Sequence, residues 1–217
     1  MKKTICLLLL VTFAAGCNMT GFGKGVRGSG NRQTEKRNVP DFLGLDVSGA
    51  FEVEIVSQKE RSLEITGDDN ILPLVTTEVR GNVLHIGSNK SYSVNRPITI
   101  KVGVPELRGV SSSGASKINV SGIKGSVFDV DSSGASNISL MGEAKNLRID
   151  TSGASNIEAK DLHAESVEVQ SSGAGYVSVY ATLQLKASAS GAARVDYYGD
   201  PSSVKPEVSG AGSVNKK

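Results

Sequence analysis

The stretch VDSSGASNISLMGEAKNLRIDTSGASNIEA, which runs from Val130 to Ala159, repeats almost the same pattern twice. In each half a Ser-Gly-Ala triplet is followed by Ser-Asn-Ile. The triplet recurs along the chain, with its serine at Ser48, Ser113, Ser133, Ser152, Ser172, Ser190 and Ser209. The last six serines are separated by 20, 19, 20, 18 and 19 residues. A period near 20 residues is typical of a solenoid, in which each repeat forms one coil.

When the repeats are aligned on the triplet serine, apolar and polar residues alternate, which is the period of a β-strand. The column five residues after the serine is apolar in every copy, with Ile118, Ile138, Ile157, Val177, Val195 and Val214. No segment has the spacing of an amphipathic helix, and a glycine in each repeat would destabilise a helix by about 1 kcal/mol. The pattern predicts an all-β, parallel β-solenoid with rungs of 18–20 residues, in which equivalent residues stack about 4.8 Å apart.

The triplet is predicted to shape the coil rather than to react. In this alignment Leu147 and Ile157 point inward. Thr151, Gly153 and Ser155 are at odd-numbered positions too, so they face the same side of the strand. Small residues would therefore line a narrow bend, where glycine relieves the backbone. A serine nucleophile needs a base, and neither histidine of the chain recurs beside a triplet. No catalytic residue is expected among these serines.

The front half of the repeat region is less regular. Leu45 and Val53 fit the same columns around Ser48, but the next triplet begins 65 residues later. The segments FEVEIVS, RSLEITG, NVLHIG and ITIKVGV alternate like strands, with turns near Gly67 and Gly81. We expect longer, hairpin-containing coils in this part.

The first residues have the pattern of an export signal. Two lysines precede an apolar run of 11 residues that ends at Ala15, and Cys17 follows after one glycine. The run is shorter than the roughly 20 residues that span a bilayer. The stretch from Ala14 to Cys17 resembles a bacterial lipobox. It predicts that residues 1–16 are a lipoprotein signal peptide and that Cys17 is lipidated; ordinary cleavage that leaves a free Cys17 thiol is the alternative.

Lipid chains on Cys17 would hold the mature chain to a membrane. Asn18 follows, rather than the Asp that typically retains such proteins in the inner membrane, so we expect the bacterial outer membrane, on its periplasmic or its surface face. Residues 17–38 are Gly-rich and polar and predict a flexible tether, which leaves residues 39–217 for the solenoid domain. A GxGxxG match at 23–28 lies in this tether, without the strand and helix that a dinucleotide site needs.

The composition argues against several classes of protein. Without the two lysines of the signal, 22 basic residues face 22 acidic ones, so the chain lacks the basic surface that nucleic-acid binding requires. Cys6 leaves with the signal and Cys17 is modified, so no disulfide or thiolate site is expected. The segment from Gly67 to Asn70 lacks the Gly-Asp nonapeptide pattern of calcium-binding β-rolls, and a turn is the favoured interpretation. No metal or cofactor is predicted.

The outward columns contain a candidate acidic cluster. Asp131 and Asp150 should stand on neighbouring rungs, about 5 Å apart, with Asp129 beside them. Carboxylates at this separation are used by retaining glycosidases, so a polysaccharide-cleaving enzyme is one interpretation. The favoured one is a solvated ladder, since Asp129, Arg148, Glu168 and Lys186 alternate in sign along their column.

Tyrosines gather near the end of the chain. Tyr180 and Tyr198 share one column, and Tyr176 lies outward in another. Exposed tyrosine is suited to the recognition of sugars or proteins, because its ring is rigid and amphipathic. The alternative is that these residues seal the end of the solenoid or form a face for self-association.

In its repeats the chain resembles the bacterial lipoprotein family of auto-transporter adhesin heads, the GIN-domain family. The resemblance is carried by FLGLDVSGAFEVEI and by the repeats SSGASKINV, SSGASNISL and TSGASNIEA, and it covers about Phe42 to Val214. It implies a β-solenoid with an adhesin-like role, and it brings no catalytic residues.

We therefore predict a non-enzymatic, lipid-anchored β-solenoid of the cell envelope that acts as a binding, adhesin-like or structural module. Its partners would be the membrane, through the lipid, and a glycan or protein ligand at Tyr176, Tyr180 and Tyr198, with a homo-oligomer left open. The alternative is a polysaccharide-cleaving β-helix enzyme that uses the acidic cluster.

Overall fold

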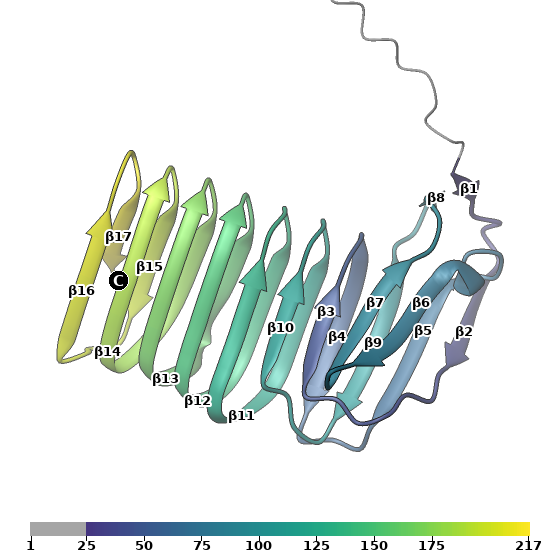
Figure 1. The fold of residues 1–217 in the computed structure, drawn as a ribbon, viewed down its shortest axis with the longest axis horizontal. Coiled ribbons are helices and arrows are strands. Elements are labelled where there is room, and N and C mark those ends of the chain that lie inside the picture. The colour runs from purple at the N-terminus through teal and green to yellow at the C-terminus, as the bar shows by residue number, and fades with distance from the viewer. Residues whose placement is uncertain (1–24) are drawn as a thin grey trace, which may run out of the picture.

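The computed structural model describes residues 25–217, which form a row of stacked β-coils (Figure 1). The strands are β1 (Val26–Arg27), β2 (Arg32–Lys36), β3 (Gly44–Val47), β4 (Phe51–Ser57), β5 (Ser62–Asp68), β6 (Val75–Arg80), β7 (Val83–Ser88), β8 (Tyr92–Ser93), β9 (Ile98–Val104), β10 (Gly109–Ser112), β11 (Lys117–Ser132), β12 (Asn137–Gly153), β13 (Asn156–Gly173), β14 (Tyr176–Gly191), β15 (Arg194–Tyr198), β16 (Ser203–Val208) and β17 (Ser213–Lys216). A 3-10 turn, η1, spans Leu72–Leu74. All strands except β1 and β8 belong to one sheet that surrounds the core.

The long strands β11–β14 each bend once, so that one coil has two arms on opposite sides of the core. The first arm of β11, residues 117–121, pairs with β4, whereas its second arm, residues 129–132, pairs with β10. All neighbours from β10 to β17 pair in parallel. Ile138 and Ile157 are register partners, and both are buried. The predicted parallel β-solenoid is confirmed.

The N-terminal coils contain antiparallel pairs, as expected from their irregular sequence. β6 and β7 form a hairpin, and β5 pairs antiparallel with β9. Gly81 and Asn82, which join β6 to β7, both have positive φ values of 56° and 66°. This is the requirement of the two-residue turns that suit the twist of a hairpin.

The predicted tether does not extend to residue 38. Within the described part, β1 pairs with β8, and β2 pairs antiparallel with β5. The Arg37 guanidinium also donates to the carbonyl oxygens of Leu72 and Val75, at 2.9 and 2.7 Å. The side chains of β2 are mostly exposed, so its sequence, RQTEK, carries no apolar alternation that would have revealed a strand. The ordered domain therefore includes residues before 39.

The triplets form the turns that lead from one coil to the next. An added Cβ at Gly134 would lie 2.3 Å from the carbonyl oxygen of Gly114 in the turn below, so only glycine fits there. The same oxygen accepts a hydrogen bond from the hydroxyl of Ser136, at 3.2 Å. Ser136 and Ser155 are buried, and small side chains fill this end of the coil as predicted.

The predicted signal peptide 1–16, the lipidation site Cys17 and the tether up to residue 24 lie outside the described residues. Among residues 25–217, no helix has the length and apolar character needed to cross a membrane.

Candidate functional site

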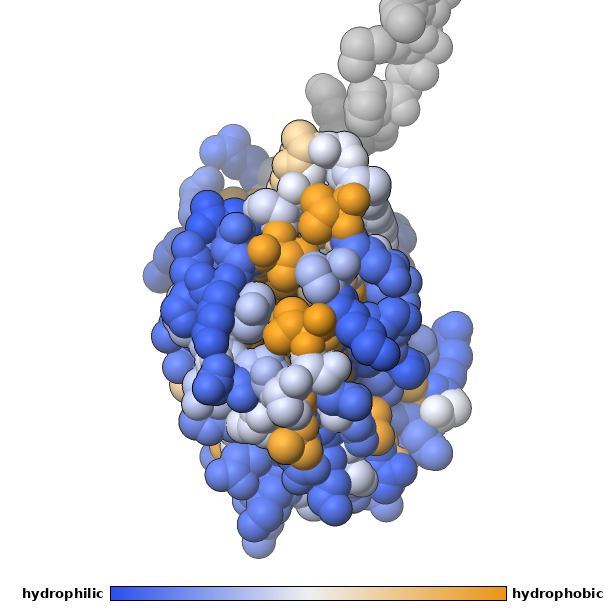
Figure 2. All heavy atoms as spheres, turned by 90° about the vertical axis from the view of Figure 1, so that its left-hand side faces the viewer, coloured by the Kyte–Doolittle hydropathy of each residue, from blue (hydrophilic) through white to orange (hydrophobic). Residues whose placement is uncertain are grey.

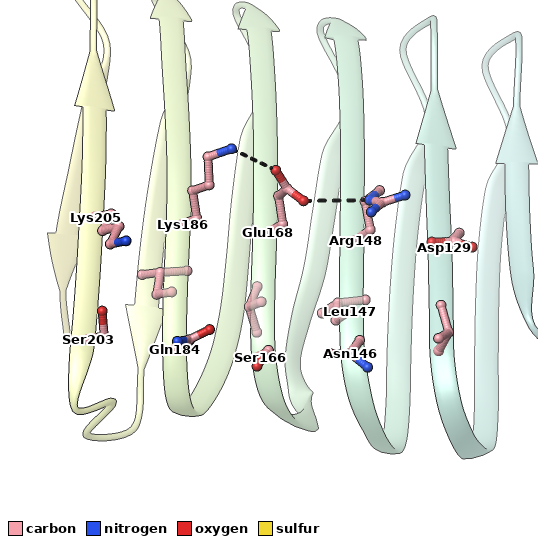
Figure 3. A pocket seen from close by; sticks show the side chains of 13 residues that line it. Asp129, Asn146, Leu147, Arg148, Ser166, Glu168, Gln184, Lys186, Ser203 and Lys205 are labelled. Carbon is pink, nitrogen blue, oxygen red and sulfur yellow. Dashed lines mark hydrogen bonds and ion pairs between the residues drawn. The ribbon is translucent and has the colours of Figure 1, made fainter.

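A shallow groove of ≈ 580 Å³ crosses the second arms of β11–β14 and the adjacent strand β16 (Figure 3). Two rows of outward side chains border it, because every second residue of a strand points to the same face. The charged row contains Asp129, Arg148, Glu168, Lys186 and Lys205, each in register with the next. The second row contains Val127, Asn146, Ser166, Gln184 and Ser203.

The charged row is held by ion pairs. Glu168 lies between Lys186, at 3.0 Å, and Arg148, at 3.7 Å, as Figure 3 shows. The hydrogen bond and the charge of Lys186 lower the pKa of Glu168, and Glu168 in turn raises the pKa of Lys186. The expected ladder is thus present from Arg148 to Lys186. Asp129 makes no ion pair within the described residues, and one of its carboxylate oxygens, Oδ1, is buried without a hydrogen-bond partner.

The acidic cluster is only partly brought together. Asp131 and Asp150 are register partners and line a hollow of ≈ 170 Å³, together with Asp46 and several serines. Partial burial of the carboxyl group, followed by the charges of Asp150 and Asp129, raises the pKa of Asp131. Asp129 lines the larger groove and also, together with Asp131, a further hollow of ≈ 270 Å³. The side chains of Asp131 and Asp150 remain largely exposed, so the hollow of ≈ 170 Å³ is open to solvent rather than an enclosed cleft.

A histidine–aspartate pair extends the same outward row toward the N-terminal coils. Asp46 on β3 pairs in register with His85 on β7, and Asp46 Oδ2 lies 2.9 Å from His85 Nδ1. Asp46 stands two residues before Ser48, in the column that holds Asp131 and Asp150. The repeat alignment could have placed Asp46, but not His85, because β7 is followed by no triplet.

Tyr176 is tied into the structure by polar contacts. Its hydroxyl donates to Asp196 Oδ2 at 3.2 Å, and the Arg194 guanidinium lies 5.9 Å from the centre of its ring. Asp196 is 2% exposed and also accepts hydrogen bonds from Arg194 and Asn215. Burial of the phenol and the nearby Asp196 charge raise the pKa of Tyr176. This cluster joins β14, β15 and β17.

Tyr180 and Tyr198 are register partners, as predicted, and the structure adds His163 to their row. The rings of His163 and Tyr180 stack with centroids 4.3 Å apart and an interplanar angle of 24°. The sequence alignment missed His163 because the register shifts between Ala159 and His163, which moves it relative to the triplet. Tyr176 lies in a different outward row, in register with Arg194, on the same arm of β14 as Tyr180.

The C-terminal end of the solenoid exposes apolar side chains that a further coil would otherwise bury. Figure 2 shows an apolar band in the middle of this end, flanked by hydrophilic side chains. Val204 and Val208 of β16 are 37% and 50% exposed there, since no further coil covers them within the described residues.

These surfaces offer ion pairs, amides, hydroxyls and stacked rings, which are groups suited to recognition. In residues 25–217 no group of three or more His, Cys, Asp or Glu side chains is arranged to hold a metal ion.

Comparison with known proteins agrees with the fold. A "putative adhesin" from Bacteroides fragilis has a TM-score of 0.70 and 23% identity, over 89% of this chain and 100% of that one. A "putative lipid binding protein" from Parabacteroides distasonis has a TM-score of 0.51 and 24% identity, over 88% of this chain and 99% of that one. A "putative adhesin" from Parabacteroides merdae has a TM-score of 0.53 and 22% identity, over 88% and 98%. At this identity the likeness concerns the fold.

No curated protein matches the chain at a significant level. The profile of one family, described as "Putative auto-transporter adhesin, head GIN domain", matches residues 41–201, from the segment before β3 to the loop before β16. This range covers most of the chain and includes six of the seven triplets. The chain therefore belongs to the GIN-domain family of auto-transporter adhesin heads.

Proposed function

We propose that this protein is a non-enzymatic, lipid-anchored binding module of the bacterial cell envelope, which recognises its ligand through the groove on the second arms. The observation that carries the proposal is the groove itself, whose charged row is already fixed by the Arg148–Glu168–Lys186 ion pairs. Side chains that are held in place before binding lose little conformational entropy when a ligand arrives. The adhesin description of the family supports a binding role.

The arrangement of the groove suits an extended ligand. Amide and hydroxyl groups repeat once per strand at Asn146, Ser166, Gln184 and Ser203, at about 4.8 Å intervals. A polymer that lies across the strands could meet one such group after another. A glycan chain has this kind of repeating hydroxyl pattern, whereas a compact small molecule would use only part of the groove.

The anchor would set the orientation of the solenoid. Seven residues lie between Cys17 and Gly25, and the eight steps from Cys17 to Gly25 span at most about 26–29 Å. β1 follows at one end of the solenoid, and β16 and β17 form the other end (Figure 1). The proposal therefore puts the N-terminal coils near the membrane and the groove on the distal coils. Cys17→Ala should release the protein into the soluble periplasmic fraction; retention in the membrane fraction would contradict the anchor.

Arginine substitutions that fill the groove test the binding role. Ser166→Arg and Gln184→Arg place a long charged side chain in the second row that borders the groove, while their backbones keep their strand positions. Asn119→Arg is the matched control, since Asn119 is exposed on the first arm of β11. Binding to a glycan array and to envelope fractions should fall for both groove variants and stay unchanged for the control. Equal binding by all three variants would refute the groove.

The second candidate function is the cleavage of a polysaccharide by Asp131 and Asp150. The observation that favours it is the raised pKa of Asp131 beside a second carboxylate, the situation of an acid that keeps its proton near another ionised acid. Asp150→Asn should then abolish any cleavage measured with polysaccharide substrates. Cleavage that persists in this variant would exclude the pair.

A further inference from the structure

A second hollow lies where the first arms bend into the second arms, separate from the groove. It has a volume of ≈ 480 Å³, and its polar lining consists of Lys124, Glu143, Lys145, His163, Glu165 and Thr182. Ala144 and Ala164, which are register partners, also line it. We call this site the bend hollow.

The imidazole of His163 lines the bend hollow, and an aromatic ring stacks on one of its faces. In the row across the strands, His163 stands between Glu143 on one side and Tyr180 on the other. Tyr180 covers one face of the imidazole, at 4.3 Å between ring centres. The other face of the imidazole is on the side of Glu143, which lines the hollow together with His163. Among residues 25–217 no aromatic ring stacks on that second face.

The charged side chains of the bend hollow are balanced and unpaired. Lys124 and Lys145 offset Glu143 and Glu165, so the lining has no net charge when the imidazole is neutral. Lys124 and Glu143 are register partners, yet within the described residues none of the four makes an ion pair or a side-chain hydrogen bond. The groove differs, because there Glu168 joins Arg148 and Lys186. The donors and acceptors of the bend hollow are therefore free for a ligand.

We propose that the bend hollow binds one ring of a neutral saccharide, with a C–H face of the sugar stacked on His163. A balanced lining disfavours a ligand with net charge, since one pair of side chains would repel it. Neighbouring sugar hydroxyls can donate to the carboxylates of Glu143 and Glu165 and accept from the ammonium of Lys145. Charge-assisted hydrogen bonds of this type are the stronger ones. This site is additional to the groove and does not depend on it.

The test uses the purified protein on an array of neutral gluco-, galacto- and manno-oligosaccharides, with polygalacturonate and dextran sulfate as acidic probes. The affinity for the best neutral binder is then measured by calorimetry. His163→Ala should weaken binding about tenfold, the size of an aromatic stacking contribution. Glu143→Gln should weaken it as well, since the amide loses the charge that strengthens the hydrogen bonds. His85→Ala is the matched control, because His85 lies on β7 away from the hollow and should leave binding unchanged.

The outcomes separate this inference from the proposed function. An array that is negative for all neutral sugars, binding of acidic polymers alone, or capture of a protein alone would overturn the saccharide site. Wild-type affinity in both His163→Ala and Glu143→Gln, with unchanged melting temperatures, would overturn it too. The groove variants Ser166→Arg and Gln184→Arg test a different surface, so either proposal can fail while the other stands.

Discussion

The stacked glycines of the triplets lead to a sharp prediction about stability. A Cβ added at Gly134 would lie 2.3 Å from the carbonyl oxygen and 3.0 Å from the nitrogen of Gly114. Both atoms belong to the backbone, so no side chain can move aside. The φ angle of Gly134 is not in the left-handed region, which means that the effect of Gly134→Ala is steric and not torsional.

The size of the effect on the free energy of unfolding follows from the hydrogen bonds that the clash weakens and from the cost of overpacking. The Gly114 oxygen accepts hydrogen bonds from the Ala135 N–H, at 2.9 Å, and from the Ser136 hydroxyl, at 3.2 Å. Relief of the clash separates the two turns and weakens both bonds, at about 1 kcal/mol each. Overpacking adds about 1–3 kcal/mol, and the smaller entropy of the unfolded alanine chain returns about 0.4–1 kcal/mol. We expect a net loss of about 2–4.6 kcal/mol in the free energy of unfolding.

Urea denaturation followed by far-UV circular dichroism measures this loss as a lower midpoint at an unchanged slope. Gly125→Ala is the matched control. Gly125 lies at the opposite bend, without a positive φ, and the nearest atom to its added Cβ is 3.9 Å away. The control meets no clash, so it should only gain about 0.4–1 kcal/mol, which the smaller entropy of its unfolded chain supplies. If Gly134→Ala is as stable as Gly125→Ala, the close stacking of the triplets does not determine which residue fits there.

Three further predictions concern other parts of the coil. Within the part of the chain that the structure describes, the buried hydroxyl of Thr151 has no hydrogen-bond partner. The equivalent Ser132 of the preceding coil bonds to Ser155, but the coil after Thr151 has Gly175 at the position of Ser155. Thr151→Val should therefore raise the free energy of unfolding by about 1 kcal/mol, and a loss of stability in urea would contradict this account. Asp150→Asn removes one of the charges that raise the pKa of Asp131, so an NMR titration should give a lower Asp131 pKa; an unchanged value would show that Asp150 has no influence. Among residues 25–217, β16 pairs only with β14. The Ser209 N–H donates to the Ala189 carbonyl oxygen, so by strand alternation Pro206 is at a position that faces the open edge. Proline blunts such an edge, and Pro206→Val should produce concentration-dependent association in sedimentation velocity, whereas a variant that stays monomeric would count against the role of Pro206.

The repeat sequence determined the fold of residues from β10 onward. A strict alternation and a fixed period leave few alternatives, because each apolar column must be buried and each coil buries it only against the next. The registers of Ile138 with Ile157, of Asp131 with Asp150 and of Tyr180 with Tyr198 all followed from counting residues from the triplet. The charge ladder followed in the same way, since its members share one column.

Only the tertiary structure decided the features that depend on breaks in the repeat. β2 became visible as a strand only through its pairing with β5, because an edge strand with exposed side chains carries no apolar pattern. His163 joined the tyrosine row through a shift of register, and His85 met Asp46 through a strand that has no triplet. The hollows also needed coordinates: a sequence column gives the order of side chains across strands, but the space between them depends on how each one packs.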